Sequence, residues 1–428
     1  MGSDIMRLPY RGGNWNNGAN AGLAALNLNN SRANTNTNIG FRPAFGSSQK
    51  ATPHGALSSA LSKGCRCLGY RRKTEQAAPV RRAADFKALM YDQIISFDNL
   101  HQAALRCLCG KRTSPAALRY MQRLEEHLHD THNHLLHDSY QPGGYEEFYV
   151  FEPKQRLISA PRFVDRVVHR AIMNVLEPAL DPRFIFDSYA CRKGKGVHAG
   201  ANRAQRWMRA IRQAHGPLFC LKADISKYFA SIDHARLKAI LRRHIHCDRT
   251  LRLLDAIIDS SPGRPGVGIP LGNLTSQLFA NLYLNELDRY AKHDLGIRYY
   301  IRYMDDFVVL HHDTAQLQAW RARIEQFLWS ALRLTTNSKT QIFPVGPDNG
   351  RALDFLGYRI YPTHRLLRKN SIKRIRYKLR RFKRAIAAGR LTAGDCRPCI
   401  QSWCAHAAHA NTWRLRCSLF NISSGANR

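Results

Sequence analysis

The sequence predicts an α+β fold preceded by a poorly ordered N-terminal extension, and three observations lead to this prediction. Residues 1–83 hold scattered Asn, Ser, Gly and Arg without a sustained helical period, which is typical of a low-order segment. From residue 84 onward, apolar residues recur at helical spacing in several long segments. Between those segments lie short runs rich in β-branched and aromatic residues, which indicate strands and hairpins.

The first half of the folded region is predicted to contain helices around one hairpin. Residues 85–108 and 117–140 each have the pattern of an amphipathic helix. Residues 145–161 alternate apolar and polar side chains, as the two arms of a hairpin do. Residues 165–180 return to the helical pattern, and a Gly- and Lys-rich stretch follows at residues 192–200.

The second half is predicted to contain the strands. Residues 217–224 form a short apolar strand that ends at Asp224 and precedes a helix, and residues 268–291 are a Gly/Pro turn that leads into a long helix. Two β-rich arms flank Met304, Asp305 and Asp306, which indicates a hairpin, and residues 354–362 form one more short strand.

The last predicted element is a cationic helix between residues 365 and 384. This segment contains eleven basic and no acidic residues. Four apolar side chains at helical spacing run through it, so we expect an amphipathic helix that ends at Gly389. The apolar stripe consists of Ile372, Ile375, Leu379 and Phe382.

The charge balance points to a polyanionic partner. The chain contains 66 Lys and Arg against 31 Asp and Glu, a net charge of +35. Residues 1–83 contribute +10, so +25 belongs to the folded region, and such an excess favours binding to nucleic acid phosphates. No apolar run approaches the ~20 residues that a bilayer requires, and no secretory segment follows Met1. We therefore expect a cytoplasmic protein without membrane partners.

The eleven cysteines are expected to be free thiols. Cys396, Cys399 and Cys404, with His406 close behind, resemble a metal-binding group, but no separate second pair completes the spacing of a zinc site.

Three aspartates stand where a carboxylate is costly. Asp224 ends an apolar strand, while Asp305 and Asp306 lie at the tip of a hairpin with apolar arms. Hard divalent cations prefer such oxygen ligands, and two Mg²⁺ ions about 3.5–4 Å apart can promote nucleotidyl transfer. The alternative is that Asp224 caps a helix and the other two form a turn. The order and context of the three together favour the metal site.

The motifs around these acids resemble those of reverse transcriptases. The resemblance extends from residue 84 to the C-terminus and is carried by five ordered segments, which are "LKADISKYF", "GIPLGNLTSQ", "YMDD", "NSKTQI" and "DFLGY". It implies a right-hand polymerase that copies RNA into DNA. Residues 84–215 would form N-terminal helices and fingers, residues 216–362 the palm, and residues 363–428 a helical thumb. The palm would be an antiparallel sheet with helices on one face.

The resemblance also implies roles for individual residues. Asp224 and Asp305 would bind the two Mg²⁺ ions together with Ile225, Asp306 would be a third, orienting carboxylate, and Lys339 would protonate pyrophosphate. Phe229 would exclude a ribose 2′-hydroxyl, and "DFLGYRI" would be the primer grip. The basic residues expected to hold the deoxynucleotide triphosphate are Arg156, as the first choice, and Lys154, Arg162, Arg166 and Arg192. The alternative for most of these cations is a solvated basic face.

One departure points to a subgroup. Retroviral-type enzymes have Gln-Gly-x-x-x-Ser-Pro before the palm helix, whereas this chain has Leu271, Gly272, Ser276 and Gln277 in that motif. The form resembles the reverse transcriptases of diversity-generating retroelements, which are error-prone opposite template adenine. An aliphatic residue at position 271 removes a hydrogen-bonding constraint near the templating base. The resemblance implies a small basic accessory protein as a partner, besides template RNA and the cDNA primer strand.

The asparagine-rich residues 11–45 resemble the end of a lectin-like variable protein that such elements diversify. Asn codons are adenine-rich, so we hypothesise that this segment is translated template repeat; the alternative is an RNA-binding tail. A group II intron or retron enzyme is the rival within the class, although the chain ends soon after the predicted thumb helix, which we take to count against the intron type. An RNA-binding protein with an inactive polymerase fold is disfavoured by the intact Asp224, Asp305 and Asp306.

Overall fold

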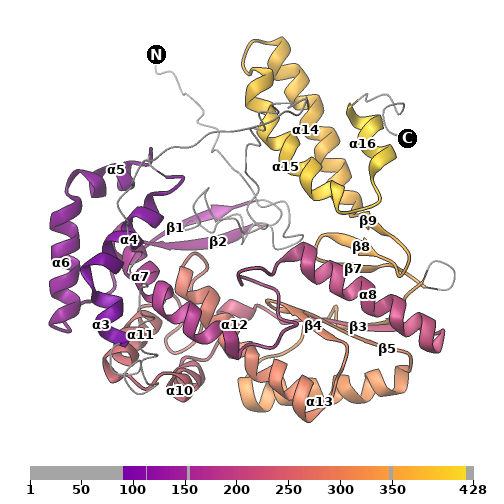
Figure 1. Ribbon diagram of the computed structural model, residues 1–428, viewed down its shortest axis with the longest axis horizontal. Helices are drawn as coiled ribbons and strands as arrows, with labels where there is room; N and C mark the ends of the chain where they lie inside the picture. The colour runs from indigo at the N-terminus through magenta and orange to yellow at the C-terminus, as the bar shows by residue number, and fades with distance from the viewer. Residues whose placement is uncertain (1–89, 112, 152–154, 347–349, 421–428) are drawn as a thin grey trace, which may run out of the picture.

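A computed structural model of the chain describes residues 90–111, 113–151, 155–346 and 350–420 (Figure 1). The predicted extension at residues 1–83, including residues 11–45, lies outside these ranges, as does Lys154. Within them, the chain forms helices, two antiparallel hairpin-based sheets and a separate two-stranded hairpin, which confirms the predicted α+β class.

The N-terminal helices pack around a long helix that follows the hairpin at residues 145–161, which we call the fingers hairpin. The segments predicted as two helices are each divided, because Ser96 caps the second part of the first and the helical backbone is interrupted at Arg123 in the second. The elements are α3 (Met90–Ile95), α4 (Phe97–Leu108), α5 (Pro115–Gln122), α6 (Leu124–Leu136) and α7 (Phe163–Leu180). Helix α4 makes its most extensive helix contact with α7.

The predicted hairpin at residues 145–161 is confirmed. Strand β1 (Tyr145–Val150) pairs antiparallel with β2 (Arg156–Pro161), with Val150 opposite Arg156. After α7 come a short 3₁₀ helix, η2 (Asp181–Arg183), and the long helix α8 (Val197–His215).

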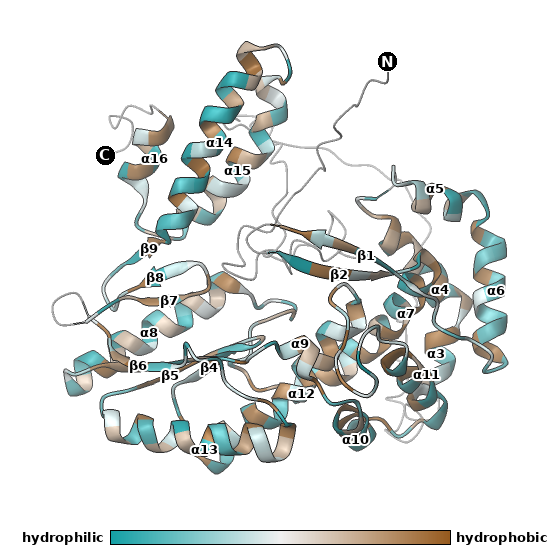
Figure 2. Ribbon diagram, turned by 180° about the vertical axis from the view of Figure 1, so that it is seen from behind, coloured by the Kyte–Doolittle hydropathy of each residue, from teal (hydrophilic) through white to brown (hydrophobic). Residues whose placement is uncertain are grey.

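A four-stranded antiparallel sheet forms the palm, in the order β4–β5–β3–β6. The strands are β3 (Phe219–Asp224), β4 (Tyr300–Tyr303), β5 (Asp306–His311) and β6 (Gln341–Pro344). Helix α13 (Thr314–Leu332) packs on one side of the sheet, and α8 lies along the other, where it contacts β4 and β5 (Figures 1 and 2). The prediction of helices on one face was therefore incomplete, because α8 covers the second face.

The helices that follow β3 and precede β4 build the core beside the sheet. They are α9 (Tyr228–Ser231), α10 (His234–His244), α11 (Asp248–Asp259), α12 (Leu274–Arg289) and a π-helical turn, η3 (Tyr290–Asp294). Helix α12, the predicted long helix, is enclosed on nearly all sides, with 13 of its 16 residues buried. A helix enclosed in this way belongs to the interior of a domain.

A second sheet connects the palm to the C-terminal helices. It consists of β7 (Leu353–Phe355), β8 (Tyr358–Ile360) and β9 (Arg365–Leu367), all antiparallel. The prediction of one strand over residues 354–362 was wrong, because the chain reverses at Leu356 and Gly357, whose φ angles are 54° and 86°. Glycine adopts this left-handed conformation readily, and a tight reversal needs it.

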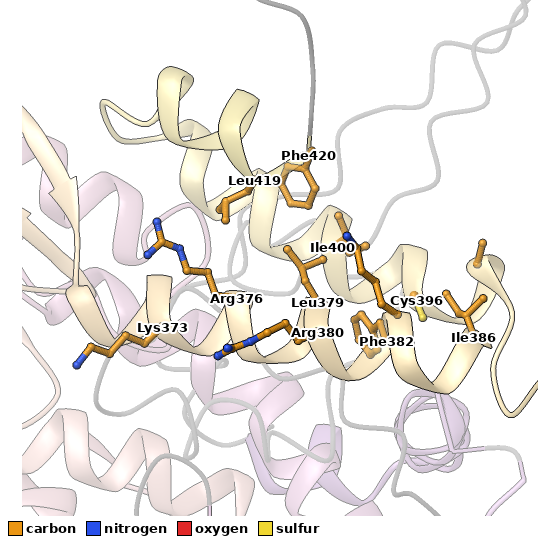
Figure 3. Close-up of a pocket in the computed structure, with 12 residues that line it drawn as sticks. Lys373, Arg376, Leu379, Arg380, Phe382, Ile386, Cys396, Ile400, Leu419 and Phe420 are labelled. Atoms are coloured by element: carbon orange, nitrogen blue, oxygen red, sulfur yellow. The ribbon is translucent and has the colours of Figure 1, made fainter. Parts of the chain in front are cut away.

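The basic helix is confirmed as α14 (Lys369–Ala387), followed by α15 (Ala393–Ala408) and α16 (Trp413–Phe420). It begins at Lys369 because residues 365–367 pair with β8, and it ends before Gly389, whose φ is 67°. Apolar side chains from all three helices line a hollow with basic residues at its edge (Figure 3). The apolar lining residues are Leu379, Phe382, Ile386, Ala393, Cys396, Ile400, Leu419 and Phe420.

A histidine cluster joins the palm to these C-terminal helices. The Tyr358 hydroxyl lies 2.9 Å from His198 Nδ1 and 3.0 Å from His406 Nδ1, and the His198 ring stacks on His409 at 3.6 Å. Burial lowers the pKa of His198 to about 3 and the pKa of His406 to about 4, and the nearby Arg365 charge acts in the same direction. The folded protein therefore holds these rings neutral.

We expect the free energy of unfolding to fall as the pH drops from about 6.5 towards 4. In this range the histidines of the unfolded chain bind protons, whereas the buried histidines of the folded protein stay neutral. Replacing His406 with glutamine should make this dependence shallower, as measured by denaturant unfolding across that range. The matched control is His246→Gln, at an exposed histidine of the palm. If the free energy of unfolding depends equally steeply on pH in the parent and in both variants, this role of the cluster is contradicted.

The nine cysteines in the described part of the chain form no disulfide bonds with one another. Across the same residues, every helix falls short of the length and apolar character that crossing a bilayer demands.

Candidate active site

The three predicted aspartates come together at one end of the palm sheet. Asp224 ends β3 and is paired directly opposite Asp306, the first residue of β5. Residues opposite each other in an antiparallel pair project to the same face, so their side chains are neighbours. Asp305 lies in the adjoining turn, and its carbonyl oxygen accepts a hydrogen bond of 3.2 Å from the Ile225 amide. Residues about eighty positions apart therefore form one acidic group.

Burial and mutual repulsion make these carboxyl groups hard to ionise. The pKa of Asp305 is raised to about 7, first by burial and then by the negative charge of Asp224. Burial also raises the pKa of Asp306 to about 6, although Lys222, whose Nζ is 3.6 Å from Asp306 Oδ2, opposes this shift. A bound cation would relieve the cost of holding these charges together.

The donor set fits a magnesium ion that shares its ligands with substrate. Among the described residues, no group of three or more His, Cys, Asp or Glu side chains is arranged to hold a metal ion by itself. Magnesium commonly takes one or two carboxylates and completes its shell with water and phosphate oxygens. Asp224 and Asp305 supply that number, and the buried Oδ1 of Asp306 has no hydrogen-bond partner within the described chain.

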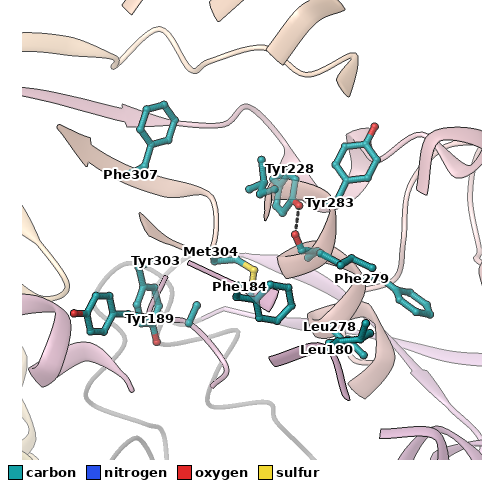
Figure 4. Close-up of a cluster of buried hydrophobic side chains, with 14 of the residues drawn as sticks. Leu180, Phe184, Tyr189, Tyr228, Leu278, Phe279, Tyr283, Tyr303, Met304 and Phe307 are labelled. Carbon is teal, nitrogen blue, oxygen red and sulfur yellow. Dashed lines mark hydrogen bonds between the residues drawn. The ribbon is translucent and has the colours of Figure 1, made fainter. Parts of the chain in front are cut away.

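The acidic turn rests on a buried apolar cluster. Tyr303 and Met304, which precede the turn's Asp305, are both less than 9% exposed, and Phe307 after it is fully buried. These side chains lie in one cluster with Tyr228, whose hydroxyl donates a hydrogen bond of 2.5 Å to the Ala280 carbonyl of α12 (Figure 4). The packing anchors the turn to the helix behind the sheet.

Arg156 is the predicted cation that the structure brings to the acids. It begins β2 on the fingers hairpin, and its charge interacts with both Asp305 and Asp224. Burial lowers the pKa of Arg156, and the two aspartates counteract that shift. A half-buried guanidinium that faces two carboxylates is a suitable group for binding a phosphate between them.

The other predicted cations lie elsewhere. Arg162 is exposed at the start of α7, and the Nε of Arg166 donates a hydrogen bond of 2.8 Å to the Pro161 carbonyl. The charge of Arg166 interacts with Glu146 and Asp165. Within the described part of the chain, neither arginine contacts Asp224, Asp305 or Asp306.

Arg192 is a correction to the sequence-based prediction, because its guanidinium is used inside the protein. Its Nε is 2.6 Å from Asp181 Oδ1, its Nη1 donates to the carbonyls of Ile185 and Ser188, and its Nη2 donates to the Asp181 carbonyl. The side chain is only 7% exposed. With its donors occupied and its surface covered, Arg192 holds a loop and is not placed to bind a nucleotide.

The motif at residues 271–277 joins the fingers hairpin to the palm. The Leu271 carbonyl accepts a hydrogen bond of 3.0 Å from the Ser159 amide of β2. At Gly272, φ is +132° and an added Cβ would lie 2.7 Å from the Ser159 oxygen, so only glycine fits. Gln277 is half-buried in the first turn of α12. Phe229 is also half-buried, and its carbonyl accepts a hydrogen bond of 2.8 Å from Ile269 in the same loop.

Lys339 lies in the segment that leads into β6. The Asn337 amide donates a hydrogen bond of 2.6 Å to the Asp224 carbonyl, so this segment runs beside the acidic group. The Lys339 amide donates to Asn337 Oδ1, and the residue is exposed.

Two polar residues of the site were not predicted. Lys222 precedes Asp224 by two positions, so the two-residue period of a strand would have placed it on the same face. Arg302 is completely buried beneath the acidic turn and paired with Asp288. A single arginine in a short strand carries no pattern that reveals such a position.

This organisation defines a nucleic-acid polymerase. Paired carboxylates stand at the tip of a palm hairpin and face a cationic fingers strand, and a strongly basic helix follows. Residues 151–360 match the model of the reverse transcriptase (RNA-dependent DNA polymerase) family. Residues 151–360 therefore form a reverse transcriptase domain, which supports RNA-directed DNA polymerase activity, and such domains use divalent metal ions.

Several known proteins are similar to this chain. Protein YkfC of Escherichia coli (strain K12) is 29% identical over 290 residues, which are 58% of this chain and 73% of YkfC. Group II intron-encoded protein LtrA of Lactococcus lactis subsp. cremoris is 24% identical over 37% of this chain and 27% of LtrA, so the match spans about a quarter of that relative. Apo telomerase from Candida tropicalis, truncated from its C-terminal domain, has a TM-score of 0.43 at 11% identity. That match covers 52% of this chain and 55% of telomerase.

Proposed function

We propose that the protein copies a template-repeat RNA into cDNA by nucleotidyl transfer with two Mg²⁺ ions, as the reverse transcriptase of a diversity-generating retroelement. The observation that carries the catalytic part is the convergence of Asp224, Asp305 and Arg156 at one end of the palm sheet. A pair of carboxylates beside a cationic phosphate-binding group is what this chemistry requires.

Each residue of the site then has a role. Asp224 and Asp305 hold the metal ions, with the backbone of Ile225 beside them, and the ions supply charge neutralisation at the attacking and leaving oxygens. Asp306, paired with Lys222, orients this group. Arg156 binds the triphosphate of the incoming deoxynucleotide, and Arg162 and Arg166 are candidates for the same task. Phe229 contacts the sugar, and Lys339 donates a proton to pyrophosphate.

The basic helix α14 is the proposed contact with the template–primer duplex. It carries nine basic and no acidic residues along the face left by its apolar stripe. Lysine and arginine in such a row neutralise successive phosphates and release counterions. Template RNA and the cDNA primer strand are therefore the proposed macromolecular partners at this surface.

The retroelement subtype rests on two features of the sequence. Leu271, Gly272 and Gln277 have the form typical of that subgroup, and residues 11–45 are asparagine-rich in the manner of a translated template repeat. A small basic accessory protein is proposed as a further partner, with RNA between the two cationic proteins. The second candidate is a group II intron or retron enzyme, which the similarity to LtrA favours.

The error spectrum distinguishes the two candidates. With its accessory protein, the purified enzyme should misincorporate mainly opposite adenine when it copies an RNA that contains all four bases, and sequencing of the cDNA measures this. Leu271→Gln should reduce the adenine errors several-fold, because an amide restores a hydrogen-bonding constraint near the templating base. The matched control is Leu157→Gln on the exposed side of β2.

An equal error rate at all four template bases would exclude the diversity-generating role and leave the intron or retron type. A fall in adenine errors of the same size in Leu157→Gln would contradict the specific role of position 271.

A further inference from the structure

A charged pair is buried directly beneath the acidic turn of the palm. Arg302 and Asp288 are both 0% exposed, with Arg302 Nη2 2.6 Å from Asp288 Oδ2 and Nε 2.7 Å from Oδ1. The arrangement is bidentate, and the Tyr300 hydroxyl donates a third hydrogen bond of 2.8 Å to the same carboxylate. Burying such a pair costs more free energy than burying apolar side chains of similar size. Stability alone therefore does not explain why a charged pair occupies this position.

One of those bonds reaches the turn itself. Arg302 Nη1 donates a hydrogen bond of 2.9 Å to the Met304 carbonyl oxygen, which belongs to the peptide bond shared with Asp305. Met304 has a φ of 57°, a conformation that a large side chain adopts only when its surroundings impose it. The charged donor thus holds the strained peptide that orients Asp305.

The same arginine connects the turn to two other segments. Its Nη1 is 3.3 Å from Asn281 Oδ1 on α12, and its Nη2 donates to Ser188 Oγ at 3.2 Å. Its backbone bonds to the loop that contains Ser188, because the Arg302 amide donates to the Asp187 carbonyl and the Tyr189 amide donates to the Arg302 carbonyl, each at 3.0 Å. The guanidinium is therefore fixed from several directions.

We infer that Arg302, held by Asp288, is a positioning residue that fixes the Met304–Asp305 peptide and so keeps the Asp305 carboxylate aimed at Asp224. The inference rests on the proposed metal-binding role of Asp305. Arg302 touches neither substrate nor the reacting atoms, and it acts through the backbone of the turn. A displacement of about 1 Å at a catalytic group can cost about a hundredfold in rate, so a rigid support has a measurable effect.

The first test variant is Arg302→Lys, which keeps the positive charge opposite Asp288 but cannot form the planar fork that reaches Met304. We expect its maximal rate of single-turnover nucleotide incorporation to fall by about 10–100-fold, as for other supports of ligating residues. The dissociation constant for primer–template, measured by fluorescence anisotropy, should change less than twofold. Hydrogen–deuterium exchange of the amides at residues 304–307 should become faster.

A second variant guards against loss of folding. The double variant Arg302→Met/Asp288→Leu replaces the buried pair with apolar side chains and leaves no single charge uncompensated. Its thermal midpoint should exceed that of Arg302→Met, whereas its incorporation rate should stay low. The control is Tyr283→Phe on α12, the helix that carries Asp288, which removes a buried hydrogen bond to the Leu332 carbonyl of α13. It should lose stability without a comparable loss of rate.

The inference is overturned if folded Arg302→Lys shows unchanged exchange at residues 304–307, or if its rate and its primer–template affinity decline in proportion. Faster hydrogen–deuterium exchange with an unchanged incorporation rate would support the contact between Arg302 and the turn. That result would instead contradict the proposed role of Asp305. The two failures are thus distinguishable.

Discussion

Replacing Asp305 with asparagine should reduce nucleotide incorporation by about 10³-fold or more while primer–template binding stays nearly intact. The amide keeps the shape of the side chain but lacks the charge that binds a divalent cation, and metal stabilisation of the reaction is worth several kcal/mol. We propose that primer–template binding depends on basic residues such as those of α14, which the change does not touch. Primer extension and fluorescence anisotropy on the same preparation measure the two quantities.

The same variant should have a higher thermal midpoint than the parent. Burial and the charge of Asp224 both oppose ionisation of Asp305, so removing this carboxylate relieves repulsion that the folded state otherwise bears. The matched control is Asp259→Asn on α11, where the aspartate is 58% exposed and pairs with Lys238. Retained incorporation in Asp305→Asn, or loss of incorporation together with RNA binding, would refute the assignment of this carboxylate.

Replacing Gly272 with alanine should reduce incorporation by about a hundredfold. The new Cβ would lie 2.7 Å from the Ser159 oxygen and 3.3 Å from the Ile158 side chain, so the loop and β2 must separate. Strand β2 begins with Arg156, and a shift of about 1 Å in such a positioning group costs about that factor. Primer extension at saturating and limiting deoxynucleotide separates the effect on rate from the effect on substrate binding.

Gly266→Ala is the matched control for this experiment. Gly266 belongs to the same loop and also has a positive φ, +76°, but an added Cβ there meets nothing within 4 Å. Both variants strain the backbone, whereas only Gly272→Ala drives β2 away from the loop. Equal losses of activity in the two variants would mean that backbone strain accounts for the effect and that the contact with Ser159 does not matter.

The elements that sequence patterns predicted correctly are those with strong local constraints. The hairpin around Met304 is bounded by apolar arms, the strand ending at Asp224 is apolar and followed by a helix, and the cationic helix combines a stripe with uniform charge. In each of these elements, the spacing of the apolar residues indicates directly which face is buried. The order of the motifs also predicted that Asp224 lies beside the Asp305–Asp306 turn, and the strand register places Asp224 opposite Asp306.

The predictions that needed correction depend on contacts that residue periodicity does not encode. Arg192 has the charge and the donors of a phosphate-binding residue, but its guanidinium already donates hydrogen bonds to Asp181 and to two loop carbonyls. Residues 354–362 have a continuous β pattern, yet Leu356 and Gly357 turn the chain back so that β8 pairs with β7. Neither outcome is visible in local periodicity, because the residue period indicates which face of an element is buried and identifies neither the hydrogen-bond partner of a side chain nor the position of a chain reversal.

Composition and motif order alone determined that this is a basic α+β protein with three acids poised for metal-dependent chemistry on nucleic acid. Only the tertiary structure decided which cations reach those acids and what supports them. Arg156 is brought within the influence of Asp224 and Asp305, whereas Arg192 is not, and Arg302 lies beneath the turn with Asp288. The physical reason is that each residue type has the same side-chain chemistry wherever it stands in the sequence. The neighbouring charges and hydrogen-bond partners that determine its role are brought together only by tertiary packing.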